Sequence, residues 1–156
     1  MNQLKFRDFT FPIFELPYNV YTCKDAASAK GISLKEELKS LILRCNEGKY
    51  YVVHLTGDKG ANFKAIRRAL SVRDVKLADK DAELSDLDTL HGAVFPFHEK
   101  IWNLPNLISA DLLELKRIYT NSGKLNSFIA FDPKLLLENP LSIVGNFSKY
   151  RIDNKI

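Results

Sequence analysis

The chain has 156 residues, of which 46% are hydrophobic and 27% charged, values that exclude a disordered or fibrous protein and suit one globular domain. Its formal net charge is +4, but residues 1–78 carry 14 basic and 8 acidic side chains, whereas residues 79–156 carry 9 and 11, so the positive charge is concentrated in the first half. Two cysteines without a CxxC partner exclude a disulfide framework and a zinc knuckle.

The first third of the chain predicts an arm, a helix and a hairpin. Residues 1–19 are rich in phenylalanine and broken by prolines, which favours an extended N-terminal arm packed on the domain. A short helix is expected over 25–30, between the capping residue Thr22 and Gly31. The apolar runs 38–45 and 50–56 predict two strands joined by a turn.

Later elements follow from helical spacing, alternation and turn residues. In chain order we expect a loop over 57–60, a helix from about 62 to 70, a strand over 72–78, a helix from 79 to about 90, a loop over 91–99, strands over 107–110, 117–120 and 127–131, and a last helix opened by Asp132-Pro133. Because strands and helices do not alternate strictly, they predict an α/β protein of the α+β type. Its sheet would be mixed, largely antiparallel and surrounded by helices.

Targeting signals are not expected in this chain. Charged residues and prolines interrupt the N-terminus where a signal peptide would be apolar, and no segment approaches the roughly 20 apolar residues of a membrane span. We therefore expect residues 1–156 to form a single cytoplasmic domain with no membrane partner.

Lys39 begins an otherwise apolar strand face. In the strand 38–45 it shares that face with Leu41, Leu43 and Cys45. An ammonium in this position can look into a pocket and hold a phosphate or a developing oxyanion. The alternative is a lysine at the end of a strand whose charge simply reaches water.

The loop 91–98 combines Gly92, Ala93 and Pro96 directly after a predicted helix. Such a loop can turn consecutive backbone N–H groups toward one point and polarise a carbonyl without a side-chain acid. The G-x-x-x-P spacing is weak evidence by itself, and an ordinary surface turn is the alternative.

The helix 62–70 places Lys64, Arg67 and Arg68 on one face. This patch suits salt-sensitive binding of nucleic-acid phosphates, or it is a solvated face. The acidic run over 79–88 lacks the EF-hand pattern, and the three histidines match no zinc motif. There is no G-x-S-x-G, P-loop or G-x-G-x-x-G, so we expect neither a metal nor a cofactor.

The order of these segments, from about Thr22 to Leu137, resembles the YbaK and prolyl-tRNA-synthetase-associated editing domain family. The matching segments are the alanine-rich helix 25–29, the lysine-led strand 38–43, the Gly-Asp loop and basic helix (55–58 and 63–66), the loop 92–98, the strand 108–111, and the turn 121–123 before the strand 127–129. In that family the strand opens with Lys-Thr and the loop is similar to G-G-V-S-P-F-G.

The resemblance implies a free-standing aminoacyl-tRNA deacylase that hydrolyses the ester of a mischarged tRNA in trans. Alanine or cysteine on the tRNA for proline are the family-based substrates, and an aminoacyl-tRNA synthetase is a possible partner. Attack by a water, a 2′-hydroxyl or the substrate's own thiol would need no general base from a side chain.

Site residues are implied by the same resemblance. Lys39 would hold the acceptor end of the tRNA, and the amides of Gly92, Ala93 and Val94 would polarise the ester carbonyl. The substrate pocket would be lined by Phe95, Pro96, Asp111, Asn121 and Gly123, with Pro96 also making the loop rigid. Contacts with the tRNA backbone would come from Lys64, Arg67 and Arg68.

The chain departs from the family pattern at Ser40, Ala93, Phe95 and His98, which replace threonine, glycine, a small hydroxyl residue and glycine. Phe95 is bulky, so we expect it to reshape the amino-acid pocket. One alternative function is a catalytically inactive module that binds tRNA or a synthetase. Another is a small-molecule hydrolase or binder of a different class, with no dependence on RNA.

Overall fold

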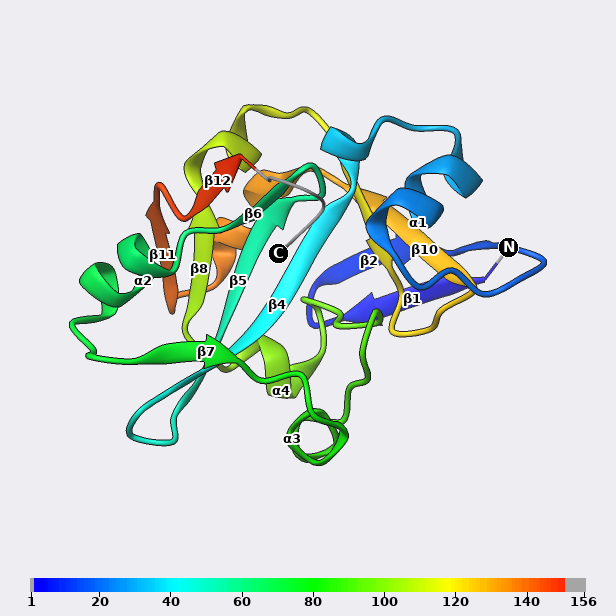
Figure 1. The fold of residues 1–156 in the computed structure, drawn as a ribbon. Coiled ribbons are helices and arrows are strands. Elements are labelled where there is room, and N and C mark those ends of the chain that lie inside the picture. The colour runs from blue at the N-terminus through cyan, green and yellow to red at the C-terminus, as the bar shows by residue number, and fades with distance from the viewer. Residues whose placement is uncertain (1, 151–156) are drawn as a thin grey trace.

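The structure is a computed structural model that describes residues 2–150. A five-stranded mixed sheet forms its centre (Figure 1). The strand order is β11-β8-β5-β4-β7. These strands are β4 (Leu38–Cys45), β5 (Tyr50–Thr56), β7 (Val75–Leu77), β8 (Asn106–Ser109) and β11 (Ser142–Gly145). Antiparallel pairing joins β4 to both β5 and β7, whereas β8 runs parallel to β5 and to β11.

Three smaller sheets flank the central one, and all of their strand pairs are antiparallel. They pair β1 (Gln3–Phe6) with β2 (Phe9–Pro12), β10 (Ser127–Phe131) with both β3 (Phe14–Glu15) and β9 (Ile118–Asn121), and β6 (Lys59–Ala61) with β12 (Ser148–Tyr150). Together the sheets confirm the predicted fold class of a mixed, largely antiparallel sheet with helices around it.

Short helices surround the sheets in the described residues. They are α1 (Cys23–Lys30), α2 (Phe63–Leu70), α3 (Asp81–Asp86) and α4 (Glu99–Trp102), with 3₁₀ segments η1 (Leu34–Glu36), η2 (Ala110–Glu114) and η3 (Pro133–Glu138). Helices α1 and α2 lie on opposite sides of the β4–β5 hairpin in Figure 1. None of the helices in residues 2–150 is long and apolar enough to cross a membrane.

The N-terminal arm is a β-hairpin rather than a simple extended segment. Its side chains Phe6 and Phe11 are buried against Phe97 and Trp102. The ring centroids of Phe11 and Phe97 are 4.7 Å apart, and those of Phe6 and Trp102 are 5.3 Å apart. Buried aromatic surface therefore fixes the arm on the domain, as the phenylalanine-rich sequence predicts.

The helix predicted from 79 to about 90 is shorter than expected. It ends at Asp86 because Asp88 adopts a left-handed conformation, with φ of 53°, and the Thr89 amide returns to the Leu84 carbonyl at 3.0 Å. This is a Schellman C-cap, formed here without glycine. The loop predicted over 57–60 is also wrong in part, because Lys59–Ala61 pair with β12.

The last helix predicted after Asp132-Pro133 is a 3₁₀ segment. The Asp132 carboxylate accepts the Lys134 amide at 3.0 Å, so the start signal in the sequence is confirmed. The β4–β5 hairpin and α2 agree with the sequence prediction to within a residue.

Candidate active site

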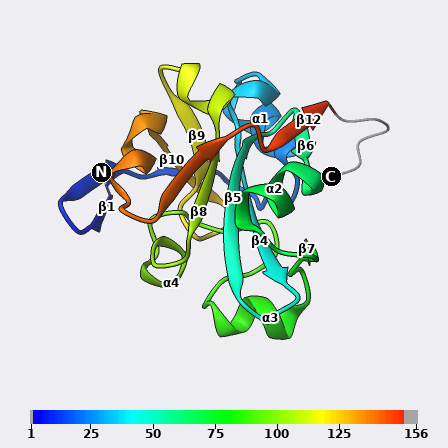
Figure 2. The same ribbon diagram turned by 90° about the vertical axis from the view of Figure 1, so that its left-hand side faces the viewer.

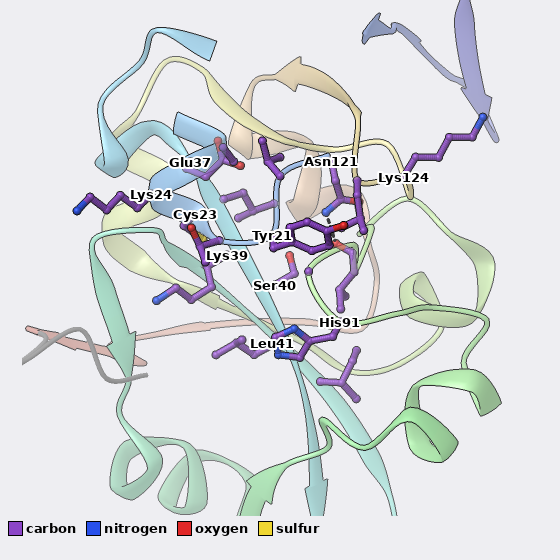
Figure 3. Close-up of a pocket in the computed structure, with 18 of the residues that line it drawn as sticks. Tyr21, Cys23, Lys24, Glu37, Lys39, Ser40, Leu41, His91, Asn121 and Lys124 are labelled. Carbon is purple, nitrogen blue, oxygen red and sulfur yellow. Dashed lines mark hydrogen bonds between the residues drawn. The ribbon is translucent and has the colours of Figure 1, made fainter. Parts of the chain in front are cut away.

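A cavity of about 450 Å³ lies against one edge of β4 (Figure 3). Residues 38–42 pair with β5 on one edge, and strand β7 pairs only with Leu43–Cys45 on the other, where residues 38–42 line the cavity. Segments around 20–26, 91–94 and 121–127 close the cavity from other sides. Its size lies within the range of about 300–1,000 Å³ that small-ligand sites occupy, and apolar side chains with a few polar groups form the lining.

Lys39 lines this cavity and is only 8% exposed. Its ammonium donates a hydrogen bond to the main-chain oxygen of Lys59 at 2.6 Å, which holds the side chain beside β6. Burial distinguishes it from a lysine that extends from the end of a strand into water. A fixed ammonium in a largely apolar cavity can bind an anionic or carbonyl oxygen.

The loop 91–94 contributes to the same cavity, and both Gly92 and Val94 line it with Lys39. Gly92 has φ of +84°, and a Cβ added there would lie 3.2 Å from the Tyr21 main-chain oxygen, so glycine allows both the turn and the close approach. The Ala93 amide donates to Leu90 O at 3.0 Å. Within residues 2–150 the amides of Gly92 and Val94 have no such acceptor.

Asn121 holds this loop in place. Its Nδ2 donates to Val94 O at 2.9 Å, while its Oδ1 accepts the Gly123 amide at 2.8 Å, so one side chain joins the β9–β10 turn to the loop. Asn121 also lines the cavity. Its contacts make it a positioning residue for the loop.

The structure does not bring Ala93, Phe95 or Gly123 to the cavity with Lys39. All three line a separate hollow of about 280 Å³. Phe95 is 6% exposed and packs on Phe97, with ring centroids 5.7 Å apart, so its side chain belongs to the aromatic core rather than to the cavity. Pro96, which separates Phe95 and Phe97 in the sequence, is also buried and does not line the cavity.

Asp111 lies behind Lys39 and outside the cavity lining. Its carboxylate forms an ion pair with the Lys59 ammonium. The main-chain oxygen of Lys59 in turn accepts a hydrogen bond from the Lys39 ammonium. Partial burial acts to raise the pKa of Asp111, but hydrogen bonds from Lys59 and Ser109 together with the Lys59 charge outweigh it and lower that pKa. Lys59 therefore connects Asp111 to Lys39.

The basic residues of α2 are also remote from the cavity. Lys64 and Arg68 are exposed and Arg67 is half-buried, and none of them lines it. Two other exposed lysines, Lys24 and Lys124, do lie in the lining, and Figure 3 shows them on either side of the cavity. Sequence reasoning missed both because each is isolated among uncharged neighbours or beside an acidic residue.

A buried ion pair forms part of the wall. The Lys30 ammonium lies 2.8 Å from both carboxylate oxygens of Glu37 and 4.9 Å from the ring centre of Phe128. The Lys30 and Glu37 side chains are 2% and 5% exposed. Burial raises the pKa of Glu37 to about 7 and lowers that of Lys30, in each case against the attraction of the partner. No periodicity in the sequence marks this pair.

A second buried polar group lies under the cavity. His54 is fully buried, with Nδ1 2.8 Å from Ser40 Oγ and Nε2 2.6 Å from Asn106 Oδ1. The sequence left His54 without a companion, because Asn106 is 52 residues away and reaches it only through the parallel pairing of β5 and β8. Ser40 lines the cavity, so this chain of hydrogen bonds ends there.

No metal-binding group of three or more histidine, cysteine, aspartate or glutamate side chains is found in the part of the chain that the structure describes. The polar side chains around the cavity include those of Lys24, Lys39 and Lys124, several hydroxyl groups and the Lys30–Glu37 pair, together with Cys23, Asp79, His91 and Asn121.

Solved structures with a similar fold include three that cover most of this chain. The hypothetical protein APE2540 is 27% identical with a TM-score of 0.81, covering 92% of this chain and 94% of that one. A scaffold protein used for computational epitope grafting is 25% identical with a TM-score of 0.76, covering 89% and 86%. A proposed trans-editing enzyme for prolyl-tRNA synthetase is 24% identical with a TM-score of 0.76, covering 89% and 87%.

The family model of the aminoacyl-tRNA editing domain matches residues 18–138. That range is most of the chain, and it includes Lys39, the loop 91–94 and Asn121. The match confirms the family resemblance read from the order of the sequence motifs. The chain belongs to the aminoacyl-tRNA editing domain family.

Proposed function

We propose that this chain is a free-standing aminoacyl-tRNA deacylase and that the 450 Å³ cavity binds the aminoacylated 3′ end of a mischarged tRNA. One observation carries the proposal: the buried Lys39 and the amide-bearing residues Gly92 and Val94 line the same cavity. Family membership supports the editing reaction in general.

The chemistry follows from the groups that line the cavity. The amides of Gly92 and Val94 would hydrogen-bond the ester carbonyl oxygen and stabilise the negative charge that develops there. Water attacks the carbonyl carbon and gives up a proton, which the neighbouring ribose hydroxyl can relay. The carbon–oxygen bond to the ribose then breaks, and the ribose oxygen leaves with a proton. Lys39 would hold the oxygen-rich acceptor end, and the proposed steps invoke no metal.

The lining of the cavity and the lysines beside it suggest which substrates to test. The apolar lining favours a small, weakly polar amino acid, and alanine or cysteine on the tRNA for proline are the first substrates to test. Lys24 and Lys124 would attract the phosphates next to the terminal adenosine. Binding of a prolyl-tRNA synthetase is a separate proposal, tested by repeating the assay with that enzyme present.

The test is a deacylation screen across charged tRNAs with wild type and Lys39→Met, which keeps most of the side-chain stem. An exposed lysine outside the cavity, replaced in Lys134→Met, is the matched control. We expect hydrolysis of at least one mischarged tRNA, unchanged in the control and strongly reduced in Lys39→Met at equal folded fraction. Binding of charged tRNA without hydrolysis would instead identify an inactive module, and equal rates in all three proteins would refute the deacylase.

A further inference from the structure

A chain of three hydrogen-bonded polar side chains connects the interior of the sheet to the cavity. Asn106 Oδ1 lies 2.6 Å from His54 Nε2, and His54 Nδ1 lies 2.8 Å from Ser40 Oγ. Ser40 and His54 are direct partners across the β4–β5 pair. Asn106 and His54 are 1% and 0% exposed, whereas Ser40 is half-buried and lines the cavity.

The orientation of Asn106 is fixed by three main-chain carbonyls. Its Nδ2 lies 2.7 Å from Leu104 O, 3.2 Å from Ile101 O and 3.4 Å from Trp102 O. Carbonyl oxygens only accept hydrogen bonds, so the amide nitrogen must face them and the amide oxygen must face His54. Rotating the amide by half a turn would set an oxygen against three others.

The tautomer of His54 follows from that orientation. Asn106 Oδ1 can only accept, so the proton of the neutral ring must lie on Nε2, which leaves Nδ1 with its lone pair. Complete burial lowers the pKa of His54 to about 4, against the hydrogen bond to Asn106, so the ring is neutral near pH 7. Ser40 must therefore donate its only hydroxyl proton to Nδ1.

We propose that Ser40 is a dedicated hydrogen-bond acceptor in the cavity, which binds an N–H or O–H donor of the aminoacyl-adenosine end of the substrate. Its own proton is committed to His54, so only the lone pairs of its oxygen remain for a ligand. Figure 3 shows the Ser40 side chain between Tyr21 and Leu41. The proposal rests on the proposed function for the identity of the ligand, but not for the polarity of the site.

Two donors of such a ligand fit this chemistry: the ribose hydroxyl next to the ester, and the α-ammonium. Among the charged side chains of the lining, Lys24, Lys39 and Lys124 are cationic, Asp79 is anionic, and Lys30 pairs with Glu37. The lining therefore carries a net positive charge, which favours the neutral hydroxyl. Like charges disfavour a further ammonium in a partly desolvated site.

Ser40 as a covalent nucleophile is the competing role. Its Oγ would attack the ester carbon, its proton would move to His54 Nδ1, and the ribose oxygen would take that proton on leaving. That step places a positive charge on a fully buried ring whose other partner is a neutral amide, which offers little stabilisation. Acid quenching during turnover followed by mass spectrometry would detect the aminoacyl-serine, and such an adduct on Ser40 would overturn the acceptor role.

The ligand test measures binding, so it does not depend on catalysis. The probes are alanyl-adenosine analogues with an amide in place of the ester: one complete, one lacking the vicinal ribose hydroxyl, and one lacking the α-amine. Calorimetry compares wild type with Ser40→Ala, and Ser40→Thr is the conservative variant that keeps the hydroxyl. We expect Ser40→Ala to weaken binding of the complete analogue about 3- to 10-fold, as for one neutral hydrogen bond, and Ser40→Thr to restore it.

The two truncated analogues identify the donor. On the analogue that lacks the partner of Ser40, wild type and Ser40→Ala should bind equally, and we expect this for the missing hydroxyl. Equality on the amine-free analogue would assign the α-ammonium instead. Equal affinity of Ser40→Ala and wild type for the complete analogue, or no binding by wild type, would refute the proposal. Deacylation by wild type that Lys39→Met abolishes would leave the proposed function standing in either case.

A spectroscopic measurement tests the polarity directly in folded wild type. Nitrogen-15 chemical shifts of His54 should show a protonated Nε2 and an unprotonated Nδ1 from pH 6 to 8. A proton on Nδ1 in this range would mean that Ser40 accepts from His54 and is free to donate, which contradicts the acceptor role.

Discussion

Replacing Gly92 by alanine tests whether the loop 91–94 must keep its close approach to Tyr21. Gly92 has φ of +84°, and its added Cβ would lie 3.2 Å from the Tyr21 main-chain oxygen. The left-handed conformation costs a non-glycine residue about 1–2 kcal/mol. The contact with Tyr21 also forces the loop or its neighbour to move by a few tenths of an ångström.

Gly48→Ala provides the matched control. Gly48 has φ of +81° in the β4–β5 turn, and a Cβ added there meets nothing within 4 Å. Both variants should lose about 1–2 kcal/mol of unfolding free energy in urea from the backbone alone. Only Gly92→Ala displaces the amides of Gly92 and Val94.

Activity should separate the two variants. A misplacement of 1 Å can cost about 100-fold in rate, so a shift of a few tenths of an ångström predicts a loss of roughly 3- to 10-fold in kcat/KM for Gly92→Ala. Gly48→Ala should retain the wild-type rate at temperatures where it is folded. Wild-type activity in Gly92→Ala, or an equal loss in both variants, would refute the assignment of the loop to the reaction site.

Three further predictions concern charge. Lys124→Gln should weaken tRNA binding more than Lys64→Gln, and should lower the slope of log affinity against log salt by about 0.7 for one lost contact with a single-stranded phosphate; equal effects would contradict the placement of the acceptor end. Lys30→Met should lower the unfolding free energy by about 3–5 kcal/mol, because it leaves a buried carboxyl unpaired, and Lys30→Met/Glu37→Leu should recover most of it in urea titrations. Burial raises the pKa of Glu37 to about 7, so the folded state holds a proton that the unfolded state releases near pH 4.5; wild-type stability should therefore fall as the pH rises from 4.5 through 7, and this fall should be absent in the double variant.

The central hairpin and α2 could be predicted because their side chains follow one period over a whole element. Residues 38–45 and 50–56 are two segments rich in apolar and β-branched or aromatic residues on either side of a turn, and the strands have the same bounds in the structure. Strands β6 and β12 contain three residues each, too few to show alternation. Their pairing depends on residues almost 90 positions apart meeting in space, which no local pattern records.

The sequence indicated Lys39 and the loop at Gly92 as parts of the candidate site, but not the other residues that line the cavity. Lys39 stands out as a charge on an apolar strand face, and Gly92 as a turn residue after a helix. Which loop side chains face the cavity depends on the backbone dihedrals, and these turn Phe95 into the aromatic core. Asp111 is held by Lys59, a contact between residues 52 positions apart.

Main-chain donors stabilise a developing charge only when their positions are set before the substrate arrives, because reorienting them during the reaction would cost the energy that they supply. The loop 91–94 meets this condition through contacts of its neighbours. Ala93 N bonds to Leu90 O, Thr89 Oγ1 donates to Ala93 O at 3.3 Å, and Asn121 holds Val94 O. The Ala93 amide is thus used to hold the turn, and under the proposed function the amides on either side of it, at Gly92 and Val94, would bind the ester carbonyl. Lys39 is held in the same way by a hydrogen bond to the Lys59 main chain. The groups to which we assign the reaction are therefore ordered by contacts within the protein rather than by a ligand, as the proposed electrostatic stabilisation requires.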